Sequence, residues 1–248
     1  MRRFAKHILS SVGLDVRRIQ NIRQHEALTW QQKQDAMWHP FLSHLDIRTI
    51  IDVGANTGQF ADLIYRYCPL AQIISFEPLK SCHDSLLQVL QKFPQHRIVQ
   101  AAVGNEPTTT NMNASQFSPC SSLLPGTDLL GEDYPDAALT EIVEVPVVRI
   151  DDVLSGINLE KNILVKFDVQ GFEIPAMDGE PEILKRARLV VCEVCFFRRL
   201  YDGQPLFHEI YSKLREFGFT YMGNAEQHKR KTDGRIVEAD AVFERLEA

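Results

Sequence analysis

The sequence predicts an α/β fold in which a mostly parallel sheet is wrapped by helices. From Thr49 onward, short β-branched runs alternate with amphipathic helical segments, which is the pattern of repeated strand–helix–strand units. The chain has 248 residues, of which 44% are hydrophobic and 24% charged. It is therefore long enough for one sizeable core of this kind.

Five apolar runs have the length and composition of buried parallel strands. They are residues 49–54, 72–78, 97–104, 162–170 and 188–194. A helix is expected over 204–217, followed by two strands, 219–223 and 240–246, joined by a long polar hairpin loop. This last pair would close the parallel sheet with an antiparallel strand.

Two further segments lie outside this strand and helix alternation. Residues 1–46 carry apolar residues at helical spacings with arginines between them, which predicts a helical appendage or cap on a main domain, 47–248. Residues 108–149 form an insertion in which two strand-like runs, 109–114 and 141–149, flank a middle rich in Ser, Pro and Gly. An insertion this long is usually functional or disordered.

Charge and cysteine content restrict the partners and the compartment. The formal net charge is −6, which gives no field to gather a polyanion, so no nucleic-acid partner is expected. The five cysteines are an odd set without paired clusters, which favours a reducing, cytoplasmic location. Cys192 and Cys195 have C-x-x-C spacing but lie in an apolar run, and we interpret them as small core residues.

Membrane association is limited to one weak alternative. No apolar run reaches the roughly 20 residues needed to span a bilayer. The basic, partly amphipathic segment 1–46 would allow a weak peripheral contact with an anionic membrane, although a cap over the pocket or a dimer contact is the simpler expectation. The sequence sets no expectation for the oligomeric state.

The first two predicted strands end in residues suited to an adenosine ligand. Gly54 and Gly58 follow the first strand and precede a helix, where glycines let a ligand approach the backbone. Their G-x-x-x-G spacing differs from the G-x-G-x-x-G of a dinucleotide site, and Asp52 before them suits a cationic amino group. Glu77 ends the second strand, 25 residues after Asp52, close to the spacing of an acid that binds ribose hydroxyls.

At these positions the chain resembles the FkbM-type methyltransferases. The matching motifs, in order, are D-V-G-A-N-T-G at 52–58, F-E-P at 76–78, A-A-V-G at 101–104, S-S-L at 121–123, V-P-V at 145–147 followed by Asp151 and Asp152, and K-F-D-V-Q-G-F-E at 166–173. The first motifs are shared by most class I methyltransferases. The K-x-D-x-x-G-x-E block is considerably more specific, and the resemblance covers nearly everything from residue 49 to residue 246.

The resemblance implies a class I, Rossmann-like fold with a seven-stranded sheet, S-adenosylmethionine as cofactor, and methylation of a hydroxyl on a sugar, glycan or small natural product. Carried over, the expected cofactor contacts are Asp52, Gly54, Asn56 and Gly58 at the methionine end, Glu77 with Pro78 at the ribose, Ala102 at the adenine, and Ser122 in the insertion. One departure is Gln170, where the family commonly has Glu. It removes a negative charge beside the presumed reaction centre.

The acceptor chemistry points to charged residues at two neighbouring strand ends. Methylating an alcohol requires alignment of the oxygen and a base or a metal. Asp168 ends the fourth strand, Lys166 lies two residues earlier on the same face, and Glu193 ends the next strand. We expect Asp168 to be catalytic, either alone, with Lys166, or sharing Mg²⁺ or another divalent cation with Glu193. His208 is a weaker base candidate near the expected mouth of the site.

Lys166 also has a simpler interpretation. It is as well suited to neutralising nearby acids, because a lysine needs a large pKa depression before it can accept a proton. Glu173 is likewise explained as an acid in a first helical turn.

Three other function classes remain as alternatives. A nicotinamide-dependent oxidoreductase is disfavoured by the glycine spacing. A non-catalytic adenosine-ligand-binding protein would have no need for the opposite charges of Lys166 and Asp168 at the pocket floor. A nucleic-acid base methyltransferase is disfavoured by the charge and by the lack of an Asn/Asp-Pro-Pro-aromatic run after the fourth strand.

Overall fold

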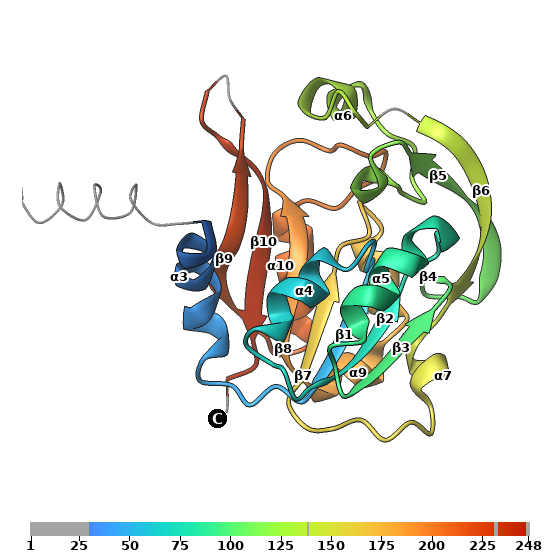
Figure 1. The fold of residues 1–248 in the computed structure, drawn as a ribbon. Helices are drawn as coiled ribbons and strands as arrows, with labels where there is room; N and C mark the ends of the chain where they lie inside the picture. The colour runs from blue at the N-terminus through green and yellow to red at the C-terminus, as the bar shows by residue number, and fades with distance from the viewer. Residues whose placement is uncertain (1–29, 138, 231–232, 247–248) are drawn as a thin grey trace, which may run out of the picture. The chain divides into compact units, whose positions relative to one another are not determined.

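The computed structural model describes residues 30–137, 139–230 and 233–246 (Figure 1). The chain divides into two compact units, 1–40 and 41–248, and the second contains all strands of the described residues. The sequence placed this boundary at residue 46. Most of the expected appendage, and with it most of the proposed membrane contact, lies outside the described residues.

The elements alternate much as the pattern predicts. The helices are α3 (Trp30–Leu42), α4 (Gln59–Tyr65), η1 (Lys80–Cys82), α5 (His83–Leu90), η2 (Ser118–Cys120), α6 (Asp128–Asp133), α7 (Ile150–Leu154), α8 (Glu173–Asp178), α9 (Pro181–Arg186) and α10 (Phe207–Glu216). The strands are β1 (Thr49–Val53), β2 (Gln72–Phe76), β3 (Gln95–Val99), β4 (Ala102–Val103), β5 (Thr108–Ser115), β6 (Leu139–Val148), β7 (Ile163–Phe167), β8 (Ala187–Cys195), β9 (Thr220–Lys229) and β10 (Ile236–Glu244).

The large sheet has seven strands in the order β3-β2-β1-β7-β8-β10-β9. Strands β3, β2, β1, β7 and β8 pair in parallel, whereas β10 is antiparallel to both β8 and β9. The prediction of a mostly parallel, seven-stranded sheet with one antiparallel strand is confirmed. The chain runs outward from β1 to β3 and resumes on the other side of β1 with β7, so the carboxyl ends of β1 and β7 meet at a topological switch point, where ligands bind in such sheets.

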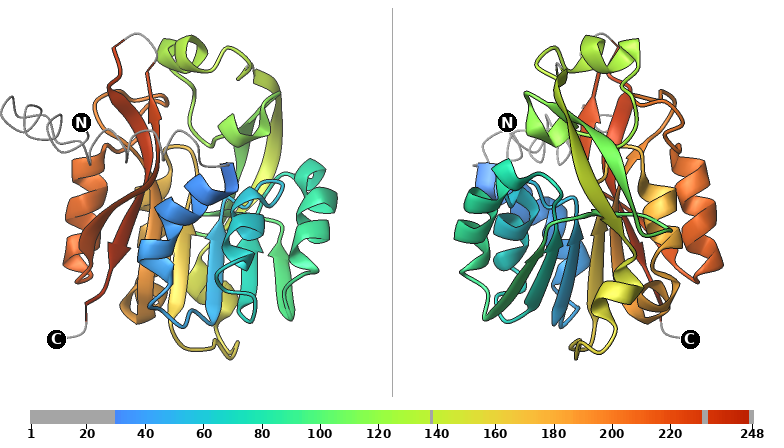
Figure 2. Two further views of the ribbon diagram at one scale, coloured as in Figure 1. Left: turned by 60° about the vertical axis from the view of Figure 1, so that its left-hand side comes forward. Right: turned by 90° about the vertical axis from the view of Figure 1, so that its right-hand side faces the viewer.

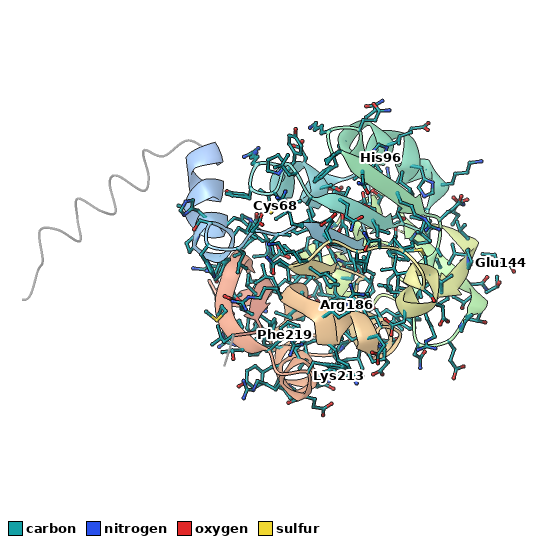
Figure 3. All side chains as sticks on the ribbon, turned by 90° about the horizontal axis from the view of Figure 1, so that it is seen from below. Cys68, His96, Glu144, Arg186, Lys213 and Phe219 are labelled. Atoms are coloured by element: carbon teal, nitrogen blue, oxygen red, sulfur yellow. The ribbon has the colours of Figure 1, made fainter. Side chains whose placement is uncertain are left out.

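Apolar side chains anchor helices on both faces of this sheet. One face packs Val165 and Val190 against Met177 of α8, Leu184 of α9 and Leu214 of α10. Helices α4 and α5 cover the other face in Figure 1. Seen from below in Figure 3, Cys68 beside α4 and Lys213 of α10 lie on opposite sides of the sheet. Because both faces are buried, the central strands are mostly apolar, and the charged exceptions Asp52 and Lys166 lie near their carboxyl ends.

The third predicted strand, 97–104, is divided between two sheets, which corrects the sequence interpretation. β3 ends at Val99, where the Ala101 N–H donates to the Val99 carbonyl over 2.9 Å. The chain then leaves the large sheet, and Ala102 pairs with Val147 of β6 instead. Apolar residues occur on both sides of this turn, because β3 ends in the half-buried Ile98 and Val99 and β4 is buried. Hydrophobicity alone therefore does not reveal the break.

The insertion forms a small sheet of its own. The runs expected at 109–114 and 141–149 are β5 and β6, and the strand order is β4-β6-β5. Figure 2 shows this sheet, with α6 above it, rising beyond the carboxyl ends of β1 and β2. The insertion therefore lies where it can cover a ligand at the switch point.

The predicted long hairpin loop between 223 and 240 is wrong. β9 continues to Lys229 and β10 begins at Ile236, so only a short connection joins them. β9 is an edge strand, and its polar residues pair through their backbone while their side chains stay largely outside the core. Among the described helices, none combines the length and apolarity needed to cross a membrane.

Candidate active site

A cavity of about 190 Å³ lies at the carboxyl ends of β1, β2 and β7. Five of the expected cofactor contacts line it: Gly54, Asn56, Glu77, Pro78 and Ala102. Its walls combine apolar side chains from the end of β2 and from β4 with polar groups from the β1–α4 turn, the insertion and the end of β7. We refer to it as the cofactor cavity, because these are the residues for which the sequence predicts cofactor contact.

Glu77 is held rigidly at the end of β2. The N–H of Asn56 donates to its Oε2 over 2.8 Å, and the N–H of Leu79 donates to its Oε1 over 2.7 Å. The side chain is 4% exposed, and burial raises the pKa of Glu77 to about 7 against the opposing effect of these two backbone donors. Each carboxylate oxygen has a further lone pair with which to accept a ligand hydroxyl.

The turn after β1 depends on its glycine for a structural reason. Gly54 has φ of 82°, and a Cβ there would lie 1.9 Å from the carbonyl oxygen of Asp168. The absent side chain allows the ends of β1 and β7 to approach each other. Gly58, with φ of 95°, is the N-cap residue of α4 and lies outside the cavity lining.

Asn56 connects the β1–α4 turn to the insertion. Its Oδ1 accepts from the N–H of Thr57 over 2.8 Å and from the hydroxyl of Ser118 over 3.0 Å. Ser118 and Ser121 of the insertion line the cavity, whereas Ser122 does not. No sequence motif marks Ser118, because only the tertiary structure brings it to Asn56.

Asp52 lies behind the cofactor cavity. It is fully buried, and neither carboxylate oxygen has a hydrogen-bond partner among the described residues. It pairs in register with Lys166 of β7. Burial raises the pKa of Asp52 to about 6, although the charge of Lys166 opposes this. Because Asp52 lies behind the cavity, it is better placed to contribute charge from beneath the site than to contact a ligand directly.

Lys166 and Asp168 form a buried ion pair at the floor of the cavity. The Lys166 Nζ donates to Asp168 Oδ2 over 2.7 Å, with the lysine side chain 7% and the aspartate side chain 29% exposed. The same ammonium lies 5.3 Å from the ring centroid of Phe60. Burial would lower the pKa of Lys166, but the charges of Asp168 and Asp52 outweigh it and the pKa is raised. Lys166 therefore stays protonated and is unsuited to act as a base.

Asp168 stays ionised for the complementary reason. Burial raises its pKa, but the charge and hydrogen bond of Lys166, together with the Gln170 amide, outweigh burial and hold the pKa below its usual value. Gln170 Nε2 donates to Asp168 Oδ1 over 2.7 Å and also to Glu193 Oε2 over 2.5 Å. Asp168 and Glu193 are thus brought together, with the Gln170 amide between them.

Glu193 belongs to a second cavity, of about 260 Å³, which adjoins the first through Gln170. We refer to this second hollow as the acidic cavity. Its lining residues are Tyr134, Glu193, Glu226, Gln227, His228, Glu238, Ala239 and Asp240. Burial and neighbouring acids raise the pKa of Glu193 well above its usual value, and burial raises the pKa of Asp240 to about 7. Part of this cluster therefore carries protons near neutral pH.

The residues between Asp168 and Glu193 do not fit a divalent cation. Among the described residues, no group of three or more His, Cys, Asp or Glu side chains could hold a metal ion. The Gln170 amide donates to both carboxylates, so donors stand where Mg²⁺ would require acceptor oxygens. The predicted metal site at Asp168 and Glu193 is not supported by this geometry.

The other predicted residues either lie away from both cavities or form hydrogen bonds to backbone groups. His208 is exposed in the first turn of α10 and lines neither cavity. The hydroxyl of Ser122 donates to the Gln170 carbonyl over 2.7 Å, so it supports the turn after β7. Glu173 accepts from the Gly171 N–H over 3.0 Å at the start of α8, and burial raises its pKa to about 7. Tyr201, which no sequence motif singled out, donates to Gln170 Oε1.

Comparison with known proteins gives one family match. The family model described as "Methyltransferase FkbM domain" matches residues 52–221. A curated relative, the 31-O-demethyl-FK506 methyltransferase FkbM of Streptomyces tacrolimicus, is 27% identical over 205 residues, covering 72% of this chain and 74% of the relative.

Solved structures are much more distant. The N-methyltransferase NodS of Bradyrhizobium japonicum WM9, in complex with S-adenosyl-L-homocysteine, has 10% identity and a TM-score of 0.48, with 92% of this chain and 98% of that chain covered. The precorrin-6y C5,15-methyltransferase of Geobacter metallireducens GS-15 has 12% identity and a TM-score of 0.43, with 87% of each chain covered. The fold assignment therefore rests on the strand order of this chain.

Proposed function

Because the chain belongs to the FkbM methyltransferase family, and is thus an S-adenosylmethionine-dependent methyltransferase, we propose that it methylates a hydroxyl oxygen of a sugar, glycan or small natural product. The observation that carries the proposal is Asp168, an ionised carboxylate fixed by Lys166 and Gln170 where the two cavities adjoin. The name of the Streptomyces tacrolimicus relative describes an O-demethylated acceptor, which supports oxygen as the methylated atom.

The chemistry of the cofactor cavity fits S-adenosylmethionine, whose sulfonium supplies an electrophilic methyl group. Phe76, Leu79 and Ala102 give an apolar wall suited to an adenine. Glu77, with free lone pairs on both oxygens, is suited to ribose hydroxyls. Asn56 and the negative charge of Asp168 lie at the polar end, where a cationic ligand is favoured.

Asp168 would align the acceptor and receive its proton. Its oxygens each accept one hydrogen bond from the protein, which leaves lone pairs for the acceptor hydroxyl. A lowered pKa makes Asp168 a weak base, so alignment contributes more than proton affinity. The hydroxyl proton would move to the carboxylate as the C–O bond forms and the bond between the methyl group and the sulfonium sulfur breaks, which leaves a neutral thioether. Lys166 keeps the carboxylate ionised before this step.

The acidic cavity is the proposed acceptor side. Carboxylates accept hydrogen bonds from hydroxyl groups, so Glu193, Glu226, Glu238 and Asp240 suit a polyhydroxylated acceptor. Those of the four acids that are ionised would repel phosphates, which disfavours a nucleic-acid acceptor.

Two binding and transfer experiments test the proposal. Calorimetry should detect S-adenosylhomocysteine and S-adenosylmethionine binding and no NAD binding. Transfer of a labelled methyl group should then be screened against glycan, lipid-linked and small-molecule fractions of the source cell. Methylation of an amine or a carbon in the product would contradict the proposed acceptor atom.

A chelator distinguishes catalysis by Asp168 without a metal from catalysis by a metal ion shared between Asp168 and Glu193. We expect EDTA to leave turnover unchanged, because the Gln170 amide stands between Asp168 and Glu193. Loss of turnover that Mg²⁺ or Mn²⁺ restores would instead establish the metal version.

A further inference from the structure

Gln170 occupies an unusual backbone position immediately after β7. Its φ is 52°, in the left-handed region that non-glycine residues rarely adopt. The Ser122 hydroxyl donates to its carbonyl over 2.7 Å and itself accepts from the Leu124 N–H over 2.9 Å. The insertion therefore supports this backbone conformation, and the side chain is directed between the two cavities.

The side-chain amide of Gln170 has only one orientation that satisfies its neighbours. Nε2 donates to Asp168 Oδ1 over 2.7 Å and to Glu193 Oε2 over 2.5 Å, while Oε1 accepts from the Tyr201 hydroxyl over 2.9 Å. The ionised carboxylate of Asp168 only accepts hydrogen bonds. Turning the amide over would place its oxygen against this carboxylate and leave the Tyr201 hydroxyl with the Cys120 carbonyl as its remaining acceptor. The side chains of Gln170, Asp168, Glu193 and Tyr201 therefore restrain one another's orientation.

Tyr201 is fixed independently of this contact. It is 1% exposed, and its hydroxyl proton is shared between Gln170 Oε1 and the Cys120 carbonyl, 3.0 Å away. Gln204 Oε1 accepts from the backbone N–H groups of Leu200 and Tyr201, over 2.7 and 3.3 Å. Burial raises the pKa of Tyr201, so the phenol keeps the proton that it donates.

We propose that Gln170 is a positioning residue that aims the Asp168 carboxylate at the acceptor, and that Tyr201 determines which end of the Gln170 amide faces Asp168. The amide restrains Oδ1 while Lys166 restrains Oδ2, so rotation of the carboxylate is restricted and the directions of its unused lone pairs are fixed. This inference rests on the proposed transfer to a hydroxyl, because alignment matters most when the base is weak.

The variant Gln170→Met tests it, since methionine has similar length and no hydrogen-bonding amide. With the acceptor fraction identified by the screen, we expect kcat to fall about 100-fold, as for a misplaced reacting group, and the affinity for S-adenosylhomocysteine to be unchanged. Tyr201→Phe should lower kcat by about tenfold, because the amide is then restrained only by its donors. A folded Gln170→Met protein with normal kcat would overturn the proposal.

Gln72→Met is the matched control. Gln72 is another buried glutamine, whose Nε2 donates to Thr49 Oγ1 and the Asn158 carbonyl at the amino end of β2. It should lower the melting temperature about as much as Gln170→Met and leave kcat intact. Equal loss of kcat in both variants would show that Gln170 acts only through stability.

Nitrogen-15 NMR of the glutamine side chains gives a readout that needs no acceptor. The Gln170 amide signals, identified by their loss in Gln170→Met, should exchange with solvent far more slowly than those of exposed Gln91 and should shift in Asp168→Asn and in Tyr201→Phe. Fast solvent exchange of the Gln170 amide signals, with no shift in either variant, would contradict the proposed hydrogen bonds of Gln170 with Asp168 and Tyr201. If the screen finds no methylated hydroxyl, the proposed function fails, while this experiment still decides whether Gln170 restrains Asp168.

Discussion

The two cavities differ in how the chain builds them. The cofactor cavity is lined mainly by residues at the ends of β1, β2 and β7, which belong to short continuous motifs. The acidic cavity is assembled from β8, the β9–β10 hairpin and Tyr134 of the insertion. The difference indicates that cofactor recognition is a property of local sequence, whereas acceptor recognition depends on how distant segments pack.

The cavities also differ in charge. In the cofactor cavity, Lys166 compensates Asp168 and the buried Asp52 beneath it. The described lining of the acidic cavity contains carboxylates but no lysine or arginine. Variants on the two sides should therefore separate cofactor binding from acceptor turnover.

Asp168→Asn should produce the largest difference between the effect on acceptor turnover and the effect on cofactor binding. It keeps the shape of the side chain and removes the charge that accepts the proton, so kcat should fall by about 10²- to 10⁴-fold. The affinity for S-adenosylhomocysteine, measured by calorimetry, should change little. An active Asp168→Asn enzyme would leave simple alignment as the explanation of the rate.

Gly54→Ala should instead disrupt the cofactor cavity. The added Cβ would lie 1.9 Å from the Asp168 carbonyl oxygen at a φ of 82°, so the ends of β1 and β7 must separate. We expect a stability loss of about 2–4 kcal/mol, measured by urea unfolding, and weaker S-adenosylhomocysteine binding. Gly131→Ala in α6, where a Cβ meets nothing within 4 Å, is the control and should be nearly neutral.

Glu193→Gln should affect the acceptor side alone. The variant keeps the side-chain shape, and its amide oxygen can still accept from Gln170, but it removes an acid that faces the acidic cavity. Replacing this acid with a neutral amide should weaken one hydrogen bond to the acceptor and raise the acceptor KM by about tenfold. Initial-rate kinetics and calorimetry with S-adenosylhomocysteine would detect this change, and an equal loss of cofactor affinity would contradict the division between the cavities.

Glu180→Gln, outside both cavity linings, should change only stability. Both oxygens of Glu180 are buried without partners among the described residues, and burial raises its pKa well above the usual 4.5. The folded state therefore binds this proton more tightly than the unfolded chain, and wild-type stability falls as pH rises through the folded pKa. Urea unfolding should show that the stability of the variant relative to the wild type increases as the pH rises above about 4.5, the usual pKa of this group. A stability difference that does not change with pH would contradict the raised pKa of Glu180.

Much of the fold was predictable, because burial on both faces leaves an apolar run for each central strand. The misses have physical causes. Apolar residues stand on both sides of the point where the chain passes from one sheet to another, half-buried Ile98 and Val99 before it and buried Ala101 to Val103 after it, so the break at Val99 leaves no mark in hydrophobicity. The polar end of β9 pairs through its backbone at a sheet edge, where side-chain pattern is uninformative.

The site was less predictable than the fold. Glu77 and Gly54 were found because strand ends meet at one sheet edge. Ser118 and Tyr201 were missed, because their contacts with Asn56 and Gln170 span 62 and 31 residues of sequence. His208 was proposed from its position after a loop, but α10 carries it on an exposed surface. Only packing distinguishes such residues.

The identity of the methylated atom tests the central claim most directly. S-adenosylmethionine carrying a ¹³C-methyl group should be incubated with the wild-type protein and the reactive fraction, and the product examined by carbon NMR. We predict a single new methyl resonance with the shift of an oxygen-bound methyl group, and at least a roughly 100-fold slower appearance of this resonance when Asp168→Asn replaces the wild type. A methyl group on nitrogen, sulfur or carbon, or an unchanged yield from the variant, would contradict the account.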